Sequence, residues 1–184
     1  MSNLSNQPLS PLDGRYKSVV ADLAMHLSEA GLNRARIQVE IEWLIHLANR
    51  NLLKTNATLD LTEIELLRNV VVNFSDADVE ALGALEATTK HDVKAVEYFV
   101  RDKLAEIGRS DLSELAHFAC TSEDINNTSY ALTVRDAINN VWLPSARSLV
   151  EKLAALAQQY REVSMLSRTH GQPATPTTIG KELA

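Results

Sequence analysis

Apolar residues recur at helical spacing along most of this 184-residue chain, and this periodicity restricts its fold more than any other feature. In residues 32–53 they fall on more than one side of a helix, which predicts a substantially buried helix. We expect Ser75 to be the N-cap of a later helix and Gly108 to end another. Shorter helices are predicted over residues 62–73, 76–88 and 93–107, so the sequence indicates the all-α class.

The helices predicted after residue 113 are longer. Two are expected, over residues 122–141 and 144–161, with Pro144 restarting the chain between them. Because residues 108–112 interrupt the helices, we expect a small N-terminal helical domain, residues 1–111, followed by the first part of a long-helix bundle, residues 112–184. The last long helix has an apolar seam at a- and d-like positions, formed by Leu149, Leu153, Leu156, Tyr160 and Val163.

The composition narrows the classes of partner and compartment. A formal net charge of −6 and a sequence pI of about 5.4 argue against a nucleic-acid partner, which usually meets a basic face. No stretch is apolar for long enough to span a bilayer, and residues 1–10 lack the regions of a signal peptide. Cys120 is the single cysteine, so no intrachain disulfide can form, and we expect it to be a small buried residue. These features predict a soluble, cytoplasmic protein without a membrane partner.

A polar run at residues 167–176 contains a candidate catalytic histidine, His170. Prolines fix φ at positions 173 and 176, and Gly171 permits backbone shapes closed to other residues, so we expect a rigid loop between two helices. Histidine titrates near physiological pH, which suits general acid or base work. On these residues alone, a plain helix-to-helix connection with an incidental histidine is an equally good interpretation.

A second polar run, residues 121–127, lies just before an apolar-periodic segment. Thr121 or Ser122 can be the N-cap of the helix that follows, and a helix N-terminus with free amides and hydroxyl groups suits an anion. Ordinary capping also explains the hydroxyls and the acidic first turn. It does not explain Asn126 and Asn127, which are poor helix formers and could face a polar ligand.

A third polar run, residues 88–92, precedes another predicted helix. One interpretation is that Asp92 caps this helix and His91 is a surface residue. The alternative is that Lys90 and His91 face a phosphate or a carboxylate, with neighbouring threonine hydroxyls as further donors.

A turn near the N-terminus presents Arg15 beside Tyr16. This pair suits either phosphate binding or packing of the N-terminal tail onto the domain. The histidines at positions 26, 46, 91, 117 and 170 show no HExxH pair and no Cys/His ligand spacing, so we expect no metal site.

Four runs taken together resemble one enzyme family, the bacterial-type adenylosuccinate lyases of the fumarase and aspartase superfamily. They match in order and spacing, and the similarity extends from about residue 8 to residue 184. The resemblance implies an all-α enzyme without a cofactor that cleaves adenylosuccinate to AMP and fumarate, and also cleaves the succinyl-carboxamide ribotide of purine synthesis. The four runs are residues 13–16, 89–98, 117–127 and 167–176.

The resemblance also implies a role for each matched residue. His170 would be the general acid that protonates the purine 6-amino nitrogen as the carbon–nitrogen bond breaks. Apart from the resemblance, His117 lies just after the interruption at residues 108–112, and we expect it to support the geometry of the site, with direct contact as the alternative. The substrate-binding residues would be Arg15 and Tyr16, which hold the nucleotide, Lys90, His91 and Asp92, which line the same site, and Thr121 and Ser122, which bind the succinyl part.

One part of the family's machinery does not occur in this sequence. In the family a serine on a loop with a Ser-Ser-x-Met-Pro signature abstracts the substrate proton, and this chain has no such run. We therefore expect the N-terminal part of a longer enzyme, inactive alone, whose intact form is a homotetramer with sites shared between subunits. Two alternatives stay open: a lyase for argininosuccinate or another succinyl substrate, and a non-catalytic chain that binds nucleotide or another subunit.

Overall fold

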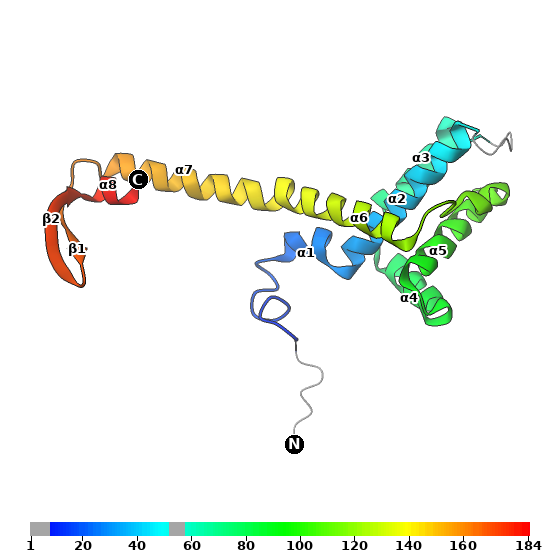
Figure 1. Ribbon diagram of the computed structural model, residues 1–184, viewed down its shortest axis with the longest axis horizontal. Helices are drawn as coiled ribbons and strands as arrows, with labels where there is room; N and C mark the ends of the chain where they lie inside the picture. The colour runs from blue at the N-terminus through cyan, green and yellow to red at the C-terminus, as the bar shows by residue number, and fades with distance from the viewer. Residues whose placement is uncertain (1–7, 52–57) are drawn as a thin grey trace, which may run out of the picture. The chain divides into compact units, whose positions relative to one another are not determined.

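The computed structural model describes residues 8–51 and 58–184 (Figure 1). Eight α-helices make up most of these residues, which confirms the all-α class, and none of the helices in the described ranges could cross a bilayer. The chain divides into two compact units, Met1–Ala137 and Ile138–Ala184, called the first and second unit here. These units are defined by contacts within this chain and do not test a domain division. The domain boundary expected at residue 111 therefore stays a prediction.

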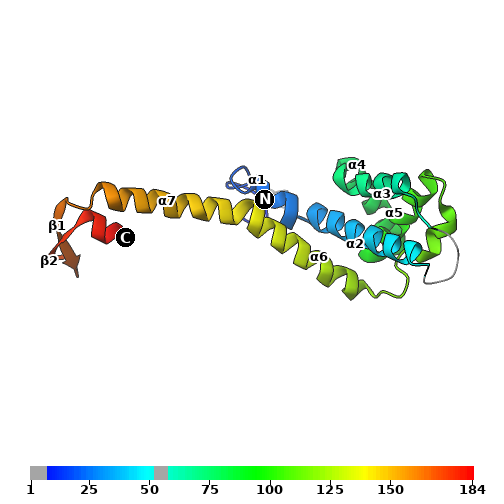
Figure 2. The ribbon, with the colours of Figure 1, turned by 90° about the horizontal axis from the view of Figure 1, so that it is seen from above.

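The first unit is built around α2 (Glu29–Asn49), a helix of 21 residues. The helix predicted over residues 32–53 is thereby confirmed as far as Asn49, and positions 52 and 53 lie outside the described residues. Packed on α2 are α1 (Ala21–Leu27), α3 (Leu61–Val72), α5 (Asp92–Glu106), the 3₁₀ helix η1 (Ser110–Leu115) and α6 (Ser122–Ala137), while α4 (Asp76–Thr89) packs on α5 (Figure 2).

The core of the first unit is aliphatic. Burial of each such side chain contributes about 1.5–3 kcal/mol to stability, so this core fixes how the neighbouring helices lie on α2. The fully buried aliphatic residues include Ile37, Ile41 and Leu44 of α2, Leu67 of α3, Leu104 of α5 and Leu112 of η1.

Local capping signals set several helix ends where the sequence predicts them. Ser75 and Asp78 form a capping box at the start of α4, which confirms the predicted N-cap. Gly108 follows α5 with φ of +77°, a conformation that glycine adopts without steric cost, and it ends that helix as predicted.

The second unit begins with a π-helical turn, η2 (Ile138–Trp142), followed by α7 (Leu143–Gln159). The helix predicted over residues 122–141 is therefore too long, because α6 ends at Ala137. Pro144 has no N–H to donate to the carbonyl of residue 140, which weakens regular α-helical bonding at this point. The same proline lies in the first turn of α7, as the sequence predicts.

The loop predicted for residues 167–176 is wrong, because this segment forms a β-hairpin. The strands β1 (Ser164–Thr169) and β2 (Gln172–Thr178) pair antiparallel, with Thr169 opposite Gln172. The prolines in β2 argue against a strand when the sequence is considered alone, since they lack the N–H that a central strand needs. In a two-stranded ribbon half of the backbone groups face outward, so proline is tolerated there.

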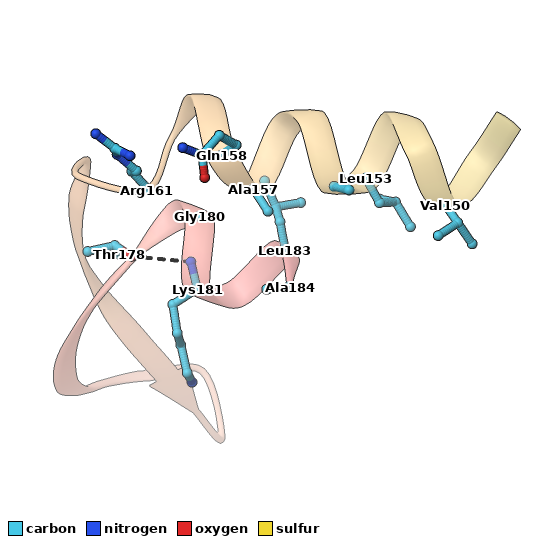
Figure 3. Close-up of a pocket in the computed structure, with 11 residues that line it drawn as sticks. Val150, Leu153, Ala157, Gln158, Arg161, Thr178, Gly180, Lys181, Leu183 and Ala184 are labelled. Atoms are coloured by element: carbon cyan, nitrogen blue, oxygen red, sulfur yellow. Dashed lines mark hydrogen bonds between the residues drawn. The ribbon is translucent and has the colours of Figure 1, made fainter. Parts of the chain in front are cut away.

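The last helix, α8 (Ile179–Leu183), packs against α7 (Figure 3). The backbone N–H of Gly180 donates to the carbonyl of Tyr160 at 2.9 Å. A Cβ atom at position 180 would collide with the carbonyl oxygen of Ala157, so the close approach of the two helices depends on glycine.

Candidate active site

Two buried charged residues of α2 organise the candidate site, and sequence reasoning missed both. Arg36 and Glu40 lie one helical turn apart, with exposed fractions of 5% and 0%. In the sequence they read as ordinary charges on a helix. A spacing of four residues places both on one face of α2, and burial of charged residues requires partners.

The guanidinium of Arg36 joins three side chains. Its Nη2 forms an ion pair with Oδ2 of Asp92 at 2.7 Å, at the start of α5. Its Nε donates to Oδ1 of Asn126 on α6 at 2.9 Å, and its Nη1 donates to Oδ1 of Asn33 on α2 at 2.9 Å. Arg36 therefore links two of the polar runs that the sequence singled out.

The run at residues 88–92 turns the chain from α4 into α5. The N-cap of α5 is His91, whose Nδ1 accepts a hydrogen bond from the backbone N–H of Lys94 at 3.2 Å, so the interpretation in which Asp92 caps this helix is wrong. Asp92 is instead the first residue of α5, where Arg36 engages its carboxylate. Lys90 has φ of +55°, the left-handed conformation that reverses the chain between the two helices.

The electrostatic environment favours the ionised form of Asp92. Burial raises the pKa of this carboxyl, but the backbone N–H of Val93, which donates at 2.9 Å, and the Arg36 guanidinium together outweigh burial. The pKa of Asp92 is therefore lower than its ordinary value. A charged, oriented carboxylate lies at this end of α5 beside the exposed ring of His91.

The run at residues 121–127 leads into α6. Both the backbone N–H and the hydroxyl of Thr121 donate to Oδ2 of Asp124, at 2.8 and 3.1 Å, and these bonds lower the pKa of that carboxyl. Ser122 is the first residue of α6 and is half-buried. Both asparagine side chains are engaged within the chain, since Oδ1 of Asn126 accepts from Arg36 and Nδ2 of Asn127 donates to Glu123 at 2.9 Å.

Glu40 holds the segment that precedes α6. Its Oε1 lies 2.6 Å from Nδ1 of His117, and its Oε2 accepts from the backbone N–H of the same residue at 3.0 Å. Burial raises the pKa of the Glu40 carboxyl above its ordinary value, although the hydrogen bond with His117 opposes the shift. His117 has φ of +60°, so this contact fixes a left-handed turn. The supporting role expected for His117 in the site stays a prediction.

Arg15 and Tyr16 contact one another. The Arg15 Nη2 donates to the Tyr16 hydroxyl at 2.7 Å, and the guanidinium carbon lies 4.8 Å from the centre of the tyrosine ring. Both residues are exposed, and within the described residues no hydrogen bond or ion pair joins either of them to Asp92 or Thr121.

His170 lies in the second unit, at the tip of the β1–β2 hairpin. His170 and Gly171 form the two-residue turn, with φ of +48° and +75°. Positive φ at both positions is the pattern of a type I′ turn, which usually has asparagine or glycine first. Histidine in this conformation costs about 1–2 kcal/mol, and such strain is often found at functional sites. The ring is exposed.

Cys120 is half-buried rather than fully buried, which corrects the prediction made for it. Burial, aided by the carboxylates of Glu40 and Asp124, raises the pKa of its thiol and disfavours the reactive thiolate. Over residues 8–51 and 58–184, no group of three or more His, Cys, Asp and Glu side chains is arranged to hold a metal ion.

A family model described as "Lyase" matches residues 14–184. This chain belongs to that lyase family. The lyase chain is also similar to curated proteins named adenylosuccinate lyase. It is 49% identical to the one from Escherichia coli (strain K12) over 96% of this chain and 39% of the relative. The relative from Haemophilus influenzae (strain ATCC 51907 / DSM 11121 / KW20 / Rd) is 45% identical over the same shares, and the one from Dictyostelium discoideum is 43% identical over 95% and 38%.

These relatives confirm the resemblance that the motifs indicate, and the lyase chain spans about two fifths of their length. Solved structures agree at the level of the fold. A fumarate lyase from Mesorhizobium sp. BNC1 has a TM-score of 0.64 at 21% identity, over 89% of this chain and 36% of that one. A 3-carboxy-cis,cis-muconate lactonizing enzyme from Pseudomonas putida has a TM-score of 0.66 at 20% identity, over 89% and 35%.

Proposed function

We propose that this chain is part of a lyase that cleaves adenylosuccinate to AMP and fumarate, and cleaves the succinyl-carboxamide ribotide of purine synthesis in the same way. The observation that carries the proposal is the link through Arg36, since Asp92 and Asn126 belong to two of the runs that carry the resemblance to adenylosuccinate lyases. The similarity to relatives of that name supports the choice of substrate.

The chemistry explains why these residue types are needed. Eliminating an amine across a succinyl group removes a proton alpha to one carboxylate, so negative charge develops on that carboxylate, while the departing nitrogen takes up a proton. The electron pair of the broken carbon–hydrogen bond becomes the carbon–carbon double bond of fumarate. The bond between the succinyl carbon and nitrogen breaks, and its electron pair stays on the nitrogen, which receives its proton from the acid. The reaction therefore needs anion-stabilising donors, a base and an acid, and it needs no cofactor.

Thr121 and Ser122 are proposed to bind the succinyl carboxylate. They lie at the start of α6, a helix of 16 residues whose N-terminal amides and dipole favour an anion. Because Asp124 already accepts from both donors of Thr121, the substrate carboxylate has to compete with it or be met by Ser122.

The phosphate-bearing part of the substrate is proposed to be held by cationic and hydroxyl-bearing residues of the first unit. Arg15 and Tyr16 supply a guanidinium and a phenol that already lie together. Lys90 and His91 lie at the chain reversal before α5, beside the oriented carboxylate of Asp92. Binding energy from such contacts, far from the reacting bond, orients the substrate and favours the transition state.

His170 is proposed to be the general acid. The turn of the hairpin holds its backbone in a defined conformation and leaves the ring exposed to a ligand. Histidine suits the role because its pKa in water is nearest to neutral pH among the side chains. The serine base of the family has no counterpart among these 184 residues, so we expect this chain alone not to release fumarate.

The intact enzyme is proposed to be a cytoplasmic homotetramer. The exposed apolar face of α7 supports association, since Leu149 and Val150 are 60% and 64% exposed. Light scattering on the complete product of the reading frame tests this proposal, and a monomeric complete product would contradict it.

Fumarate release from adenylosuccinate by the complete product of the reading frame tests the function, with argininosuccinate as the control substrate. His170→Ala is expected to lower kcat by roughly 10²-fold or more while the fold is kept, the scale for loss of a proton-transfer group. His46→Ala is the matched control, because His46 is an exposed histidine that stacks on Trp43 in the first unit. Equal activity of the two variants would reject the acid, and cleavage of argininosuccinate alone would reject the substrate.

A further inference from the structure

We propose that Arg36 is a positioning residue, which sets the start of α5 and the first turns of α6 in the arrangement that binds the substrate. The inference rests on the proposed function. The feature behind it is a single guanidinium that engages Asp92 and Asn126, one from each of the two runs. Neither partner is near Arg36 in the sequence, since they lie 56 and 90 positions away.

The geometry suits arginine and no other side chain. Three nitrogens of the guanidinium each have a different partner, at 2.7–2.9 Å, and the residue is 5% exposed. The guanidinium is planar and its donors point in fixed directions, so the positions of the three oxygens are fixed relative to one another. Asn33 comes from α2 itself and holds the plane of the group.

The packing of the helices explains why such a link is needed. Both α5 and α6 pack more extensively on α2 than on each other. The arrangement of their N-terminal ends is therefore not fixed by direct packing between them. Arg36 projects from α2 and reaches the first residue of α5 and the fifth residue of α6.

The two partners lie next to the residues proposed to bind substrate. Asp92 directly follows Lys90 and His91, and Asn126 is one helical turn beyond Ser122. Displacing either helix end would displace these binding groups. Misplacement by about 1 Å can cost about 10²-fold in rate, because catalysis depends on the alignment of bound groups.

The test compares Arg36→Lys with Arg109→Lys in the complete product of the reading frame. Lysine keeps the charge but cannot serve three partners in one plane. Arg109 is a matched control, since its side chain is 15% exposed and bonds Glu63, Asp111 and the carbonyl of Thr58, away from both runs. KM and kcat for adenylosuccinate and the midpoint of thermal unfolding are measured for both variants.

Arg36→Lys is expected to lower kcat/KM by about 10²-fold. The larger part should be a rise in KM, because the residues it positions are binding residues. Arg109→Lys should lower the unfolding midpoint and leave KM near the wild-type value. An equal effect of both variants on kcat/KM would show that Arg36 acts only through stability, and that result would overturn the inference.

A second variant covers the case in which Arg36→Lys fails to fold. Asn126→Ala removes one partner and leaves the Arg36–Asp92 ion pair in place. Asn126→Ala should raise KM. Where both single variants fold, the free-energy loss in kcat/KM of the Arg36→Lys/Asn126→Ala double variant should be smaller than the sum of the two single losses. An unchanged KM for Asn126→Ala, or strict additivity, would contradict the inference.

One readout does not depend on activity. The ring C–H signals of His91 in an NMR spectrum report the start of α5, and they should move in Arg36→Lys but not in Arg109→Lys. If the wild-type protein does not cleave adenylosuccinate, the proposed function fails, while these signals still decide whether Arg36 sets the position of His91. Unmoved signals in Arg36→Lys would overturn the inference.

Discussion

The two units of the chain differ in where their apolar side chains lie. In the first unit these side chains form a core centred on α2, and every buried apolar side chain of the described residues lies between Ala35 and Ala137. In the second unit α7 exposes its apolar face, with Leu153 at 40% exposure. The comparison shows that an amphipathic pattern predicts a helix in both units, whereas burial requires a partner that only the first unit contains.

The largest expected effect tests this difference directly. Leu44→Ala should destabilise the first unit by about 2–5 kcal/mol, because Leu44 is fully buried and truncation leaves a cavity. Leu153→Ala, the same change on the exposed face of α7, should leave the free energy of unfolding nearly unchanged. Urea unfolding followed by the fluorescence of Trp43, in a Trp142→Phe background, measures both. If both variants lost the same free energy of unfolding, the apolar face of α7 would be buried in solution.

A smaller and local effect is expected at the close contact between α7 and α8 in the second unit. Gly180→Ala should push α8 away from α7 at a cost of about 1–3 kcal/mol, because the added methyl meets backbone rather than a movable side chain. The amides of Ile179 and Gly180 donate to Val163 and Tyr160, both at 2.9 Å, so their hydrogen exchange should become faster. Amides of α2 are the control and should not change. Unchanged exchange at Ile179 and Gly180 would contradict the role given to this glycine.

The third expected effect is a dependence of the free energy of unfolding on pH, and it arises from Glu40 in the first unit. Burial raises the pKa of Glu40, so the folded chain holds this proton more tightly than the unfolded chain does. The stabilisation by protonated Glu40 is complete below the ordinary glutamate pKa and is lost as the pH rises through the raised pKa. One titrating group can change the free energy of unfolding by at most about 1.4 kcal/mol per pH unit.

Glu40→Gln removes this titration and keeps an oxygen that can accept from the His117 N–H. The free energy of unfolding of the variant, relative to the wild type, should therefore increase as the pH rises from about 4 to 7. Urea unfolding of both proteins across that range measures the difference. Parallel curves would show that Glu40 keeps its ordinary pKa in the folded chain.

Much of the fold follows from local signals in the sequence. The helices α3, α4 and α5 begin and end within one residue of their predicted positions, because capping residues and glycine act on neighbouring backbone groups. The hairpin of the second unit was not predicted. Its prolines and glycine are typical of a loop. Strand pairing depends on contacts between two segments, and a local sequence pattern does not contain such contacts.

The polar runs of the candidate site could be found in the sequence, but their connections could not. Runs with hydroxyls, histidines and acidic residues stand out before helices, and they carry the resemblance to the lyases. Arg36 and Glu40 gave no such signal, because arginine and glutamate are common on exposed helix faces and their burial is visible only when α5 and α6 are packed on α2.

The sequence by itself determined the all-α class, most helix positions and the polar runs that carry the resemblance to the lyase family. These properties depend on spacing along one chain. Tertiary structure alone decided that His91 rather than Asp92 caps α5, that His170 lies on a hairpin turn, and that Arg36 joins two distant runs. The physical reason is that hydrogen bonds and ion pairs depend on distances in space, which the folding of α2 against its neighbours sets and the order of residues does not.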